Sequence, residues 1–122
     1  MARPVHFEID ALDPERAAKF YEQVFGWKVE KWQGSTDYLL FTTGPAEEPG
    51  IDGAVGKREG EQPSTVNTIG VESVDDALAR ITQYGGKVTS PKRPIPGIGY
   101  LAYCTDPEGV PFGLMQADPE AK

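Results

Sequence analysis

His6 and Glu8 are the side chains best suited to chemistry in this chain, and they lie two positions apart in the run from Pro4 to Asp10. The run alternates apolar and polar residues, which is typical of a half-buried strand, so both side chains point to its polar face. An imidazole beside a carboxylate can act as a general base near neutral pH, and either group can bind a divalent metal. On an open sheet the same residues would only be solvated, and both interpretations stay open at this point.

Aromatic residues supply a second candidate surface, because small-molecule pockets are lined mainly by apolar and aromatic side chains. We expect Tyr38 and Tyr100 to border a cavity, since each begins a strand-like segment. For the other aromatic residues on these segments ordinary packing competes with a role in binding; they are Trp27, Trp32 and Tyr103. Cys104 is the only cysteine and lies in an apolar segment without a nearby base, so we expect a buried, inert thiol.

The elements that would position these residues begin with the strand at Pro4–Asp10. Asp13, Pro14 and Glu15 then provide an N-cap, a proline in the first turn and an acid that the helix dipole favours. An apolar stripe at helical spacing follows and ends before Gly26, a plausible C-terminal cap. Three further strands are predicted at Trp27–Gln33, Tyr38–Thr43 and Ile51–Lys57, so the first half has the order βαβββ.

The second half repeats this plan. A strand is predicted at Thr65–Val71, and a helix begins at Ser73, which forms a capping box with Asp76. Two later strands, Gly99–Thr105 and Val110–Gln116, are joined by a type I turn at Asp106–Gly109. The segment Phe25–Val29 after the first helix also matches Tyr84–Val88 after the second.

Two connecting segments carry further expectations. Glu61–Ser64 is polar and separates module one, at about residues 3–58, from module two, at about residues 64–118. Neither module is large enough to be stable alone, so we expect one domain over residues 1–122. Pro91–Gly99 contains three prolines and ends in glycines, so it could be a lid loop over a cavity or a plain connection between strands.

Composition excludes several classes of protein. A net charge of -7 opposes binding to the phosphate backbone of nucleic acids. No stretch approaches the roughly 20 apolar residues of a membrane-spanning helix, and the N-terminus lacks the apolar core of a signal peptide. We therefore expect neither nucleic acid nor a membrane as a partner, and a cytoplasmic location.

The motifs in this order resemble the vicinal oxygen chelate superfamily, which includes glyoxalase I, bleomycin-resistance proteins and extradiol dioxygenases. The motifs are His-Phe-Glu-Ile, Asp-Pro-Glu-Arg-Ala-Ala-Lys-Phe-Tyr, Phe-Gly-Trp, Gly-Gly-Lys-Val and Asp-Pro-Glu-Gly-Val-Pro-Phe-Gly-Leu-Met-Gln. The resemblance implies an α+β fold of paired βαβββ modules that form a cupped, incompletely closed mixed β-sheet, with helices outside and a small-molecule ligand inside. It also implies a homodimer.

In metal-dependent members of that superfamily, His, Glu or Gln ligands come from the first and fourth strands of each module. His6 matches the first of these positions. Val66 matches the equivalent position of the second module, seven residues before the helix cap, and cannot bind a metal. Gly113 replaces the acidic ligand of the last strand, and Asp52 is the only acid on the fourth strand of the first module.

We therefore expect a small-molecule-binding protein of the glyoxalase and bleomycin-resistance type that lacks a complete metal site and needs no cofactor. His6, Glu8, Tyr38 and Tyr100 are the predicted ligand-binding residues. The alternative is a lyase or isomerase resembling glyoxalase I, with His6 and Glu8 as catalytic candidates. Such an enzyme would use either a divalent metal held by His6 or His6 as a base. A module that serves only as an interaction subunit is a third hypothesis.

Overall fold

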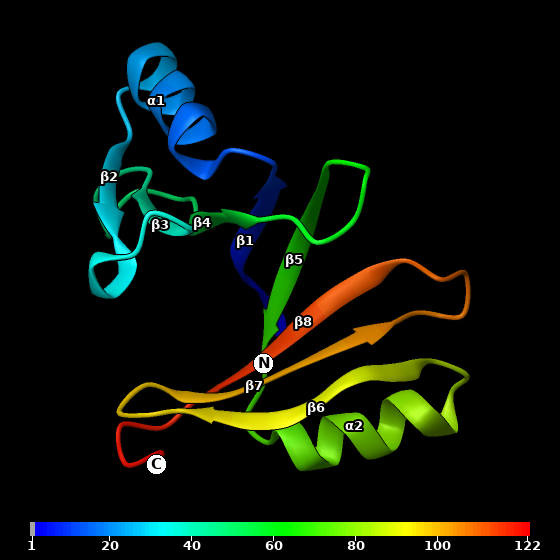
Figure 1. The fold of residues 1–122 in the computed structure, drawn as a ribbon. Coiled ribbons are helices and arrows are strands. Elements are labelled where there is room, and N and C mark those ends of the chain that lie inside the picture. The colour runs from blue at the N-terminus through cyan, green and yellow to red at the C-terminus, as the bar shows by residue number, and fades with distance from the viewer. Residues whose placement is uncertain (1) are drawn as a thin grey trace. The chain divides into compact units, whose positions relative to one another are not determined.

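The computed structural model describes residues 2–122, which divide into two units (Figure 1). The N-terminal unit comprises His6–Val66, and the C-terminal unit comprises the start of the chain up to Val5 together with Asn67–Lys122. Both boundaries fall inside strands, because β1 runs from Arg3 to Ala11 and β5 from Ser64 to Gly70.

The N-terminal unit has the predicted order βαβββ. After β1 come α1 (Pro14–Phe25), β2 (Lys28–Lys31), a 3-10 turn (Trp32–Gly34), β3 (Tyr38–Thr42) and β4 (Asp52–Lys57). Its strands lie in the order β2-β3-β4-β1, with β1 parallel to β4 and the other pairs antiparallel. The helix begins as predicted, because the Asp13 carboxylate accepts a 3.2 Å hydrogen bond from the amide of Arg16. It ends at Gly26, whose φ of 75° favours glycine.

Helix α1 covers one face of this sheet. The buried core contains Ala18, Leu39, Phe41 and Val55, and the β1 residues Phe7 and Ile9 pack against it. Trp27 belongs to the same core, since its ring centroid lies 5.2 Å from those of both Tyr21 and Phe41. Side chains alternate along a strand, so His6 and Glu8 lie on the opposite, helix-free face, as predicted.

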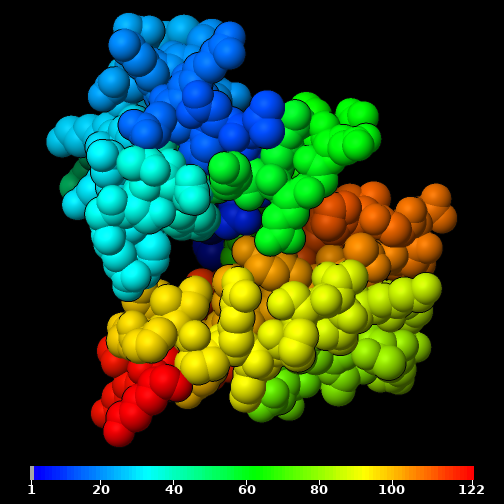
Figure 2. Space-filling model, in the orientation of Figure 1, coloured from blue at the N-terminus to red at the C-terminus, as the bar shows by residue number. Residues whose placement is uncertain are grey.

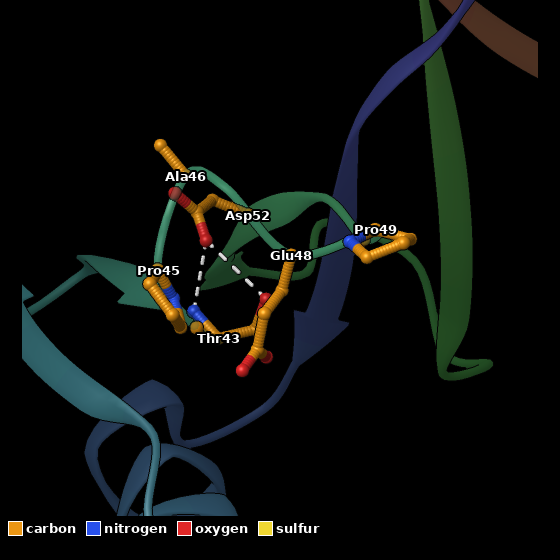
Figure 3. A pocket seen from close by; sticks show the side chains of 8 residues that line it. Thr43, Pro45, Ala46, Glu48, Pro49 and Asp52 are labelled. Atoms are coloured by element: carbon orange, nitrogen blue, oxygen red, sulfur yellow. Dashed lines mark hydrogen bonds between the residues drawn. The ribbon is translucent and has the colours of Figure 1, made fainter.

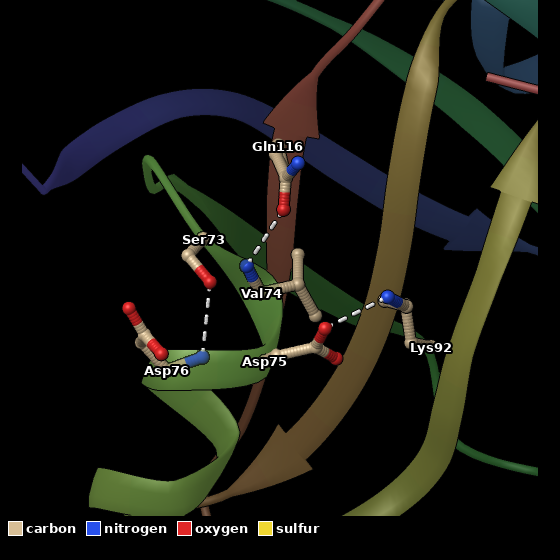
Figure 4. A network of polar contacts seen from close by, with 6 residues as sticks. All are labelled: Ser73, Val74, Asp75, Asp76, Lys92 and Gln116. Carbon is tan, nitrogen blue, oxygen red and sulfur yellow. Dashed lines mark hydrogen bonds and ion pairs between the residues drawn. The ribbon is translucent and has the colours of Figure 1, made fainter.

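The C-terminal unit repeats the plan with β5, α2 (Val74–Gln83), β6 (Lys87–Ile95), β7 (Gly99–Thr105) and β8 (Pro111–Ala117). Its strand order is β5-β8-β7-β6. The Ser73 hydroxyl accepts from the amide of Asp76 at 3.1 Å, and the amide of Val74 donates to Oε1 of Gln116 at 2.9 Å (Figure 4). The buried core consists of Val74, Ala102, Cys104 and Leu114.

The expectation that Pro91–Gly99 forms a loop is wrong for most of the segment. Residues up to Ile95 belong to β6, and only the turn at residues 96–98 connects it to β7. The prolines are tolerated because β6 is an edge strand with two register shifts, where a missing amide donor removes no essential ladder bond. The atoms of β6, yellow in Figure 2, lie at the surface of the C-terminal unit.

The turn at Asp106–Gly109 joins β7 and β8 as predicted. The Asp106 carboxylate accepts from the amides of Glu108 and Val110 at 2.8 and 3.0 Å, and Gly109 has a φ of 87°. Both modules therefore have the α+β architecture that the sequence predicts. Among the described residues, no helix is both long enough and apolar enough to cross a membrane.

Candidate functional site

The helix-free face of the N-terminal sheet carries its polar residues in cross-strand rows. Residues paired across neighbouring strands point to the same face, so the strand register defines the rows. One row joins Glu8 on β1, Ala54 on β4 and Leu40 on β3, and the next joins Asp10, Gly56 and Tyr38. A third pairs His6 with Asp52. Three of the four predicted site residues, His6, Glu8 and Tyr38, thus lie on one face.

Glu8 and Tyr38 are joined directly. The Tyr38 hydroxyl donates a 2.9 Å hydrogen bond to Oε2 of Glu8 and so bridges from β3 across β4 to β1. Small residues on β4 allow this reach, since Gly56 is buried and a Cβ there would lie 3.1 Å from Cδ1 of the Tyr38 ring. We call these two residues the Glu8–Tyr38 pair. The sequence predicted both as ligand-binding residues, but it did not predict their bond or the role of Gly56.

His6 is half-buried at the other end of this face. Burial lowers its pKa below the ordinary 6.5, and the nearby Asp52 carboxylate opposes the shift by raising it. The imidazole is therefore uncharged at neutral pH. A neutral imidazole can accept a proton or coordinate a metal, but it adds no positive charge to the site.

The two flanking acids each accept side-chain hydrogen bonds from a residue outside their own strand. Oδ1 of Asp52 accepts from the Thr43 amide at 2.8 Å and the Thr43 hydroxyl at 3.3 Å, and this clamp closes the loop between β3 and β4. Beside the clamp lies a half-open hollow of about 100 Å³ (Figure 3). Its walls are Thr43, Gly44, Pro45, Ala46, Glu48, Pro49, Gly50 and Asp52. Asp10 in turn accepts from the Ser64 hydroxyl at 2.9 Å.

The C-terminal unit carries no equivalent acid on its helix-free face. Thr68, Gly113 and Tyr103 form the matching cross-strand row. A Cβ at Gly113 would lie 3.2 Å from the Thr68 hydroxyl and 3.3 Å from the Tyr103 ring, so these side chains fill the position where the resemblance implies an acidic ligand. In the sequence, packing and binding were competing interpretations of Tyr103, and its pairing with Gly113 depends on a strand register that the sequence does not show.

Tyr100 lies on the other face of its sheet. It packs against the helix-covered core of the C-terminal unit. The reason is strand alternation, since Tyr100 shares its face with the buried Ala102 and Cys104. The Lys92 ammonium lies 5.0 Å from the ring centroid and pairs with Asp75 at 3.0 Å (Figure 4). Tyr100 thus does not share the helix-free surface.

The donors present do not fit a three-ligand metal centre. No group of three or more His, Cys, Asp or Glu side chains that could hold a metal occurs among residues 2–122. His6 and Glu8 supply two donors on one strand, and Asp52, which pairs with His6 across β1 and β4, directs Oδ1 to Thr43. At the matching positions on β5 and β8 lie Val66 and Gly113, which have no side-chain donor atom. Catalytic zinc sites commonly use three protein ligands.

Comparison with known proteins gives a consistent result. Residues 6–115 match the family model described as "Glyoxalase-like domain". The chain is 30% identical over 119 residues to "Putative glyoxylase CFP32" of Mycobacterium bovis. This alignment covers 94% of this chain and 46% of that protein. It is 29% identical over 108 residues to "Probable lactoylglutathione lyase, chloroplastic" of Arabidopsis thaliana, with 80% of this chain and 31% of that protein covered. The chain thus spans less than half the length of these relatives.

A solved structure agrees on the fold. The Mn(II)-bound glyoxalase from Novosphingobium aromaticivorans superposes with a TM-score of 0.66 at 23% identity, over 98% of this chain and 39% of that one. At this identity the similarity establishes the arrangement of elements and not the ligand or the reaction.

Proposed function

Because this chain belongs to the glyoxalase-like domain family of the vicinal oxygen chelate superfamily, we propose that it binds a small organic molecule on the helix-free face of the N-terminal unit, without a resident divalent metal. The observation that carries this proposal is the 2.9 Å hydrogen bond between Tyr38 and Glu8. The bond orders a carboxylate and an aromatic ring on a half-buried surface, which is the combination that small-molecule sites use.

The surroundings of the Glu8–Tyr38 pair support a binding role. Ala54 is fully buried between Glu8 and Leu40, so the strand beneath the pair is closely packed and presents no side-chain polar group. A hydrogen bond to a charged group contributes about 1.5–3 kcal/mol, enough to hold both side chains in one arrangement before a ligand arrives. Such preorganisation lowers the entropic cost of binding.

The metal-free part of the proposal follows from the donors. His6 and Glu8 alone would leave a divalent ion mostly coordinated by water, and Gly113 offers no side chain where the family pattern has an acid. We expect protein purified without chelator to contain far less than one equivalent of Mn, Ni or Zn, and chelator to leave its melting temperature unchanged. Stoichiometric metal retained through dialysis would contradict this.

The binding proposal is tested by screening a fragment library with ligand-observed NMR. Hits should lose affinity in Glu8→Gln and in Tyr38→Phe. Two matched controls are Glu22→Gln, an exposed acid on α1, and Tyr84→Phe, a tyrosine that is 70% exposed. Hits that bind all four variants as they bind the natural chain would place the site elsewhere, and the proposal would fail.

A second candidate is a lyase or isomerase in which His6 acts as a base. Its specific support is the lowered pKa of His6, because burial keeps the imidazole unprotonated and able to take a proton at neutral pH. Formation of lactoylglutathione from methylglyoxal and glutathione, with and without added Mn²⁺ or Zn²⁺, tests this candidate. Activity that disappears in His6→Gln would support it, and no turnover under either condition would reject it.

Assembly as a homodimer and a cytoplasmic location remain predictions drawn from the family resemblance and the composition. Light scattering during gel filtration measures the first directly. A mass of twice 13.3 kDa is expected, and a mass of one chain would contradict it.

A further inference from the structure

We infer that a second copy of this chain binds the outer side of α1. The contact surface is a row of three apolar residues on that helix, Ala17, Phe20 and Val24, which we call the α1 strip. This inference goes beyond the proposed function, because the strip lies on the helix that covers one face of the N-terminal sheet and the ligand site lies on the other face. It gives a surface to the homodimer that the family resemblance predicts.

The α1 strip is apolar and largely exposed. Its members are three and four residues apart, so they lie along one side of the helix. Ala17 borders the core that α1 covers, whereas Phe20 and Val24 are each 55% exposed. Single exposed apolar residues are ordinary, but neighbouring ones on one side of a helix are typical of a contact with another protein.

The second module shows that the plan of the fold does not require this strip. Counted from the N-cap of each helix, Phe20 corresponds to Arg80. Val24 corresponds in the same way to Tyr84, which is 70% exposed and carries a hydroxyl group. The equivalent positions in the second module thus present polar groups to water, so the apolar residues of α1 have a role that packing against the sheet does not supply.

The charges of α1 favour an antiparallel contact with a second α1. Glu15 and Glu22 lie about half a turn from Phe20, so two chains of net charge -7 can meet at the strip without opposing their acids. Arg16 lies on the strip side, one turn before Phe20. A two-fold axis near Phe20 places Arg16 beside the last turn of the other α1, which has partial negative charge and no basic residue of its own.

Sedimentation equilibrium of the purified full chain tests this surface. A contact of one helix from each copy is small, so we expect the mass to rise from 13.3 kDa towards twice that value between about 1 μM and 1 mM. Val24→Glu should raise the dissociation constant at least about tenfold, because each copy would bring a carboxylate into the contact. Tyr84→Glu makes the same change of charge at the corresponding position after α2 and should leave the dissociation constant unchanged.

Cross-linking tests the two-fold arrangement. A residue near a two-fold axis meets its own copy in the other chain, so Phe20→Cys should form a disulfide-linked dimer under mild oxidation. Tyr84→Cys should stay a single chain under the same conditions. The natural cysteine, Cys104, is buried and should not interfere.

The outcomes separate this inference from the other proposals. A mass of one chain at every concentration would overturn both the strip and the predicted homodimer. A dimer that Val24→Glu and Tyr84→Glu weaken equally, or not at all, would overturn the strip and leave the homodimer in place. Should Val24→Glu fail to fold, Phe20→Gln at the other exposed position should weaken the dimer instead, and an unchanged dimer would overturn the strip. Ligands of the Glu8–Tyr38 pair should bind Val24→Glu as they bind the natural chain, so the proposed function is judged separately.

Discussion

His6 and Asp52 lie opposite each other on two parallel strands, so the carboxylate is the charged neighbour that acts on the only imidazole of the chain. Burial and this carboxylate shift the pKa of His6 in opposite directions, and burial is the larger cause. The electrostatics at this end of the site can therefore be measured through one residue, since a single histidine gives one resolved set of imidazole resonances.

Replacing Asp52 with Asn should lower the pKa of His6 further, because the opposing attraction is removed while the burial remains. An NMR titration of the imidazole resonance measures this directly. Thr43→Val serves as the control, since it breaks the Thr43 hydroxyl contacts of the loop but keeps the Asp52 charge. An equal shift in both variants would show that loop geometry and not charge sets the pKa.

Stability should depend on pH through the same residue. The pKa of His6 is lower in the folded chain than the unfolded value of 6.5, so below pH 6.5 the unfolded chain binds the proton first. The free energy of unfolding should therefore fall as the pH drops through this window, and it should level off for this group once folded His6 is protonated. Urea denaturation at a series of pH values measures the slope. The same series in His6→Gln should show a smaller slope between pH 6.5 and 5; an identical slope would remove His6 as the cause.

The bond of the Glu8–Tyr38 pair should be sensitive to Gly56. A Cβ at this position would lie 3.1 Å from the Tyr38 ring, so Gly56→Ala should move the ring and weaken the bond to Glu8. We expect a loss of stability of at most about 1.5–3 kcal/mol, the contribution of a hydrogen bond to a charged group. In Tyr38→Phe the bond is already absent, so adding Gly56→Ala should cost less. Gly60→Ala is the control, because no atom lies within 4 Å of the added methyl group.

Cys104 should be inert in the folded chain. Its side chain is fully buried, and burial raises the pKa of the thiol, so little reactive thiolate is exposed. A thiol reagent such as dithionitrobenzoate should react only at the rate at which the chain unfolds, and quickly in denaturant. Fast labelling under native conditions would contradict the buried position.

The two units should unfold together. Both unit boundaries fall inside strands, β1 and β5, and we expect that neither half of a strand persists when the other half is lost. Val55→Ala in the N-terminal core and Leu114→Ala in the C-terminal core should therefore both lower the midpoint temperature of one shared thermal transition. Leu114→Ala should reduce the free energy of unfolding by about 2–5 kcal/mol. Two separated transitions, each moved by only one of the variants, would contradict the single domain that we predict from the sequence.

Much of the fold was predictable from local signals. The alternation from Pro4 to Asp10 identified the helix-free face, and the Asp13 and Ser73 caps identified both helix starts, because these signals act within a few residues. Prediction from the sequence failed for contacts that depend on which residues pair across neighbouring strands. The bond between Tyr38 and Glu8 joins residues 30 positions apart, and only the pairing of β4 with both neighbours brings them together.

Two structural outcomes that the sequence did not predict have the same physical origin. Tyr100 and Tyr103 are three positions apart on one strand, so they lie on opposite faces, and the sequence alone did not show which face is covered by α2. The prolines of β6 suggested a loop because proline lacks the amide that an interior strand needs. Edge strands do not have that requirement, and position in the sheet is not a local property.

The edge strand β6 also limits how copies of the chain can join. Pro91 and Pro94 remove two amide donors from it, and the register shifts bend what remains. A second molecule cannot extend a regular hydrogen-bonded ladder along this border. A dimer interface should therefore not be formed by pairing β6 with a strand of another molecule. The prolines of β6 and the charged side chains of Lys92 and Arg93 should also oppose fibril formation through this edge at high protein concentration.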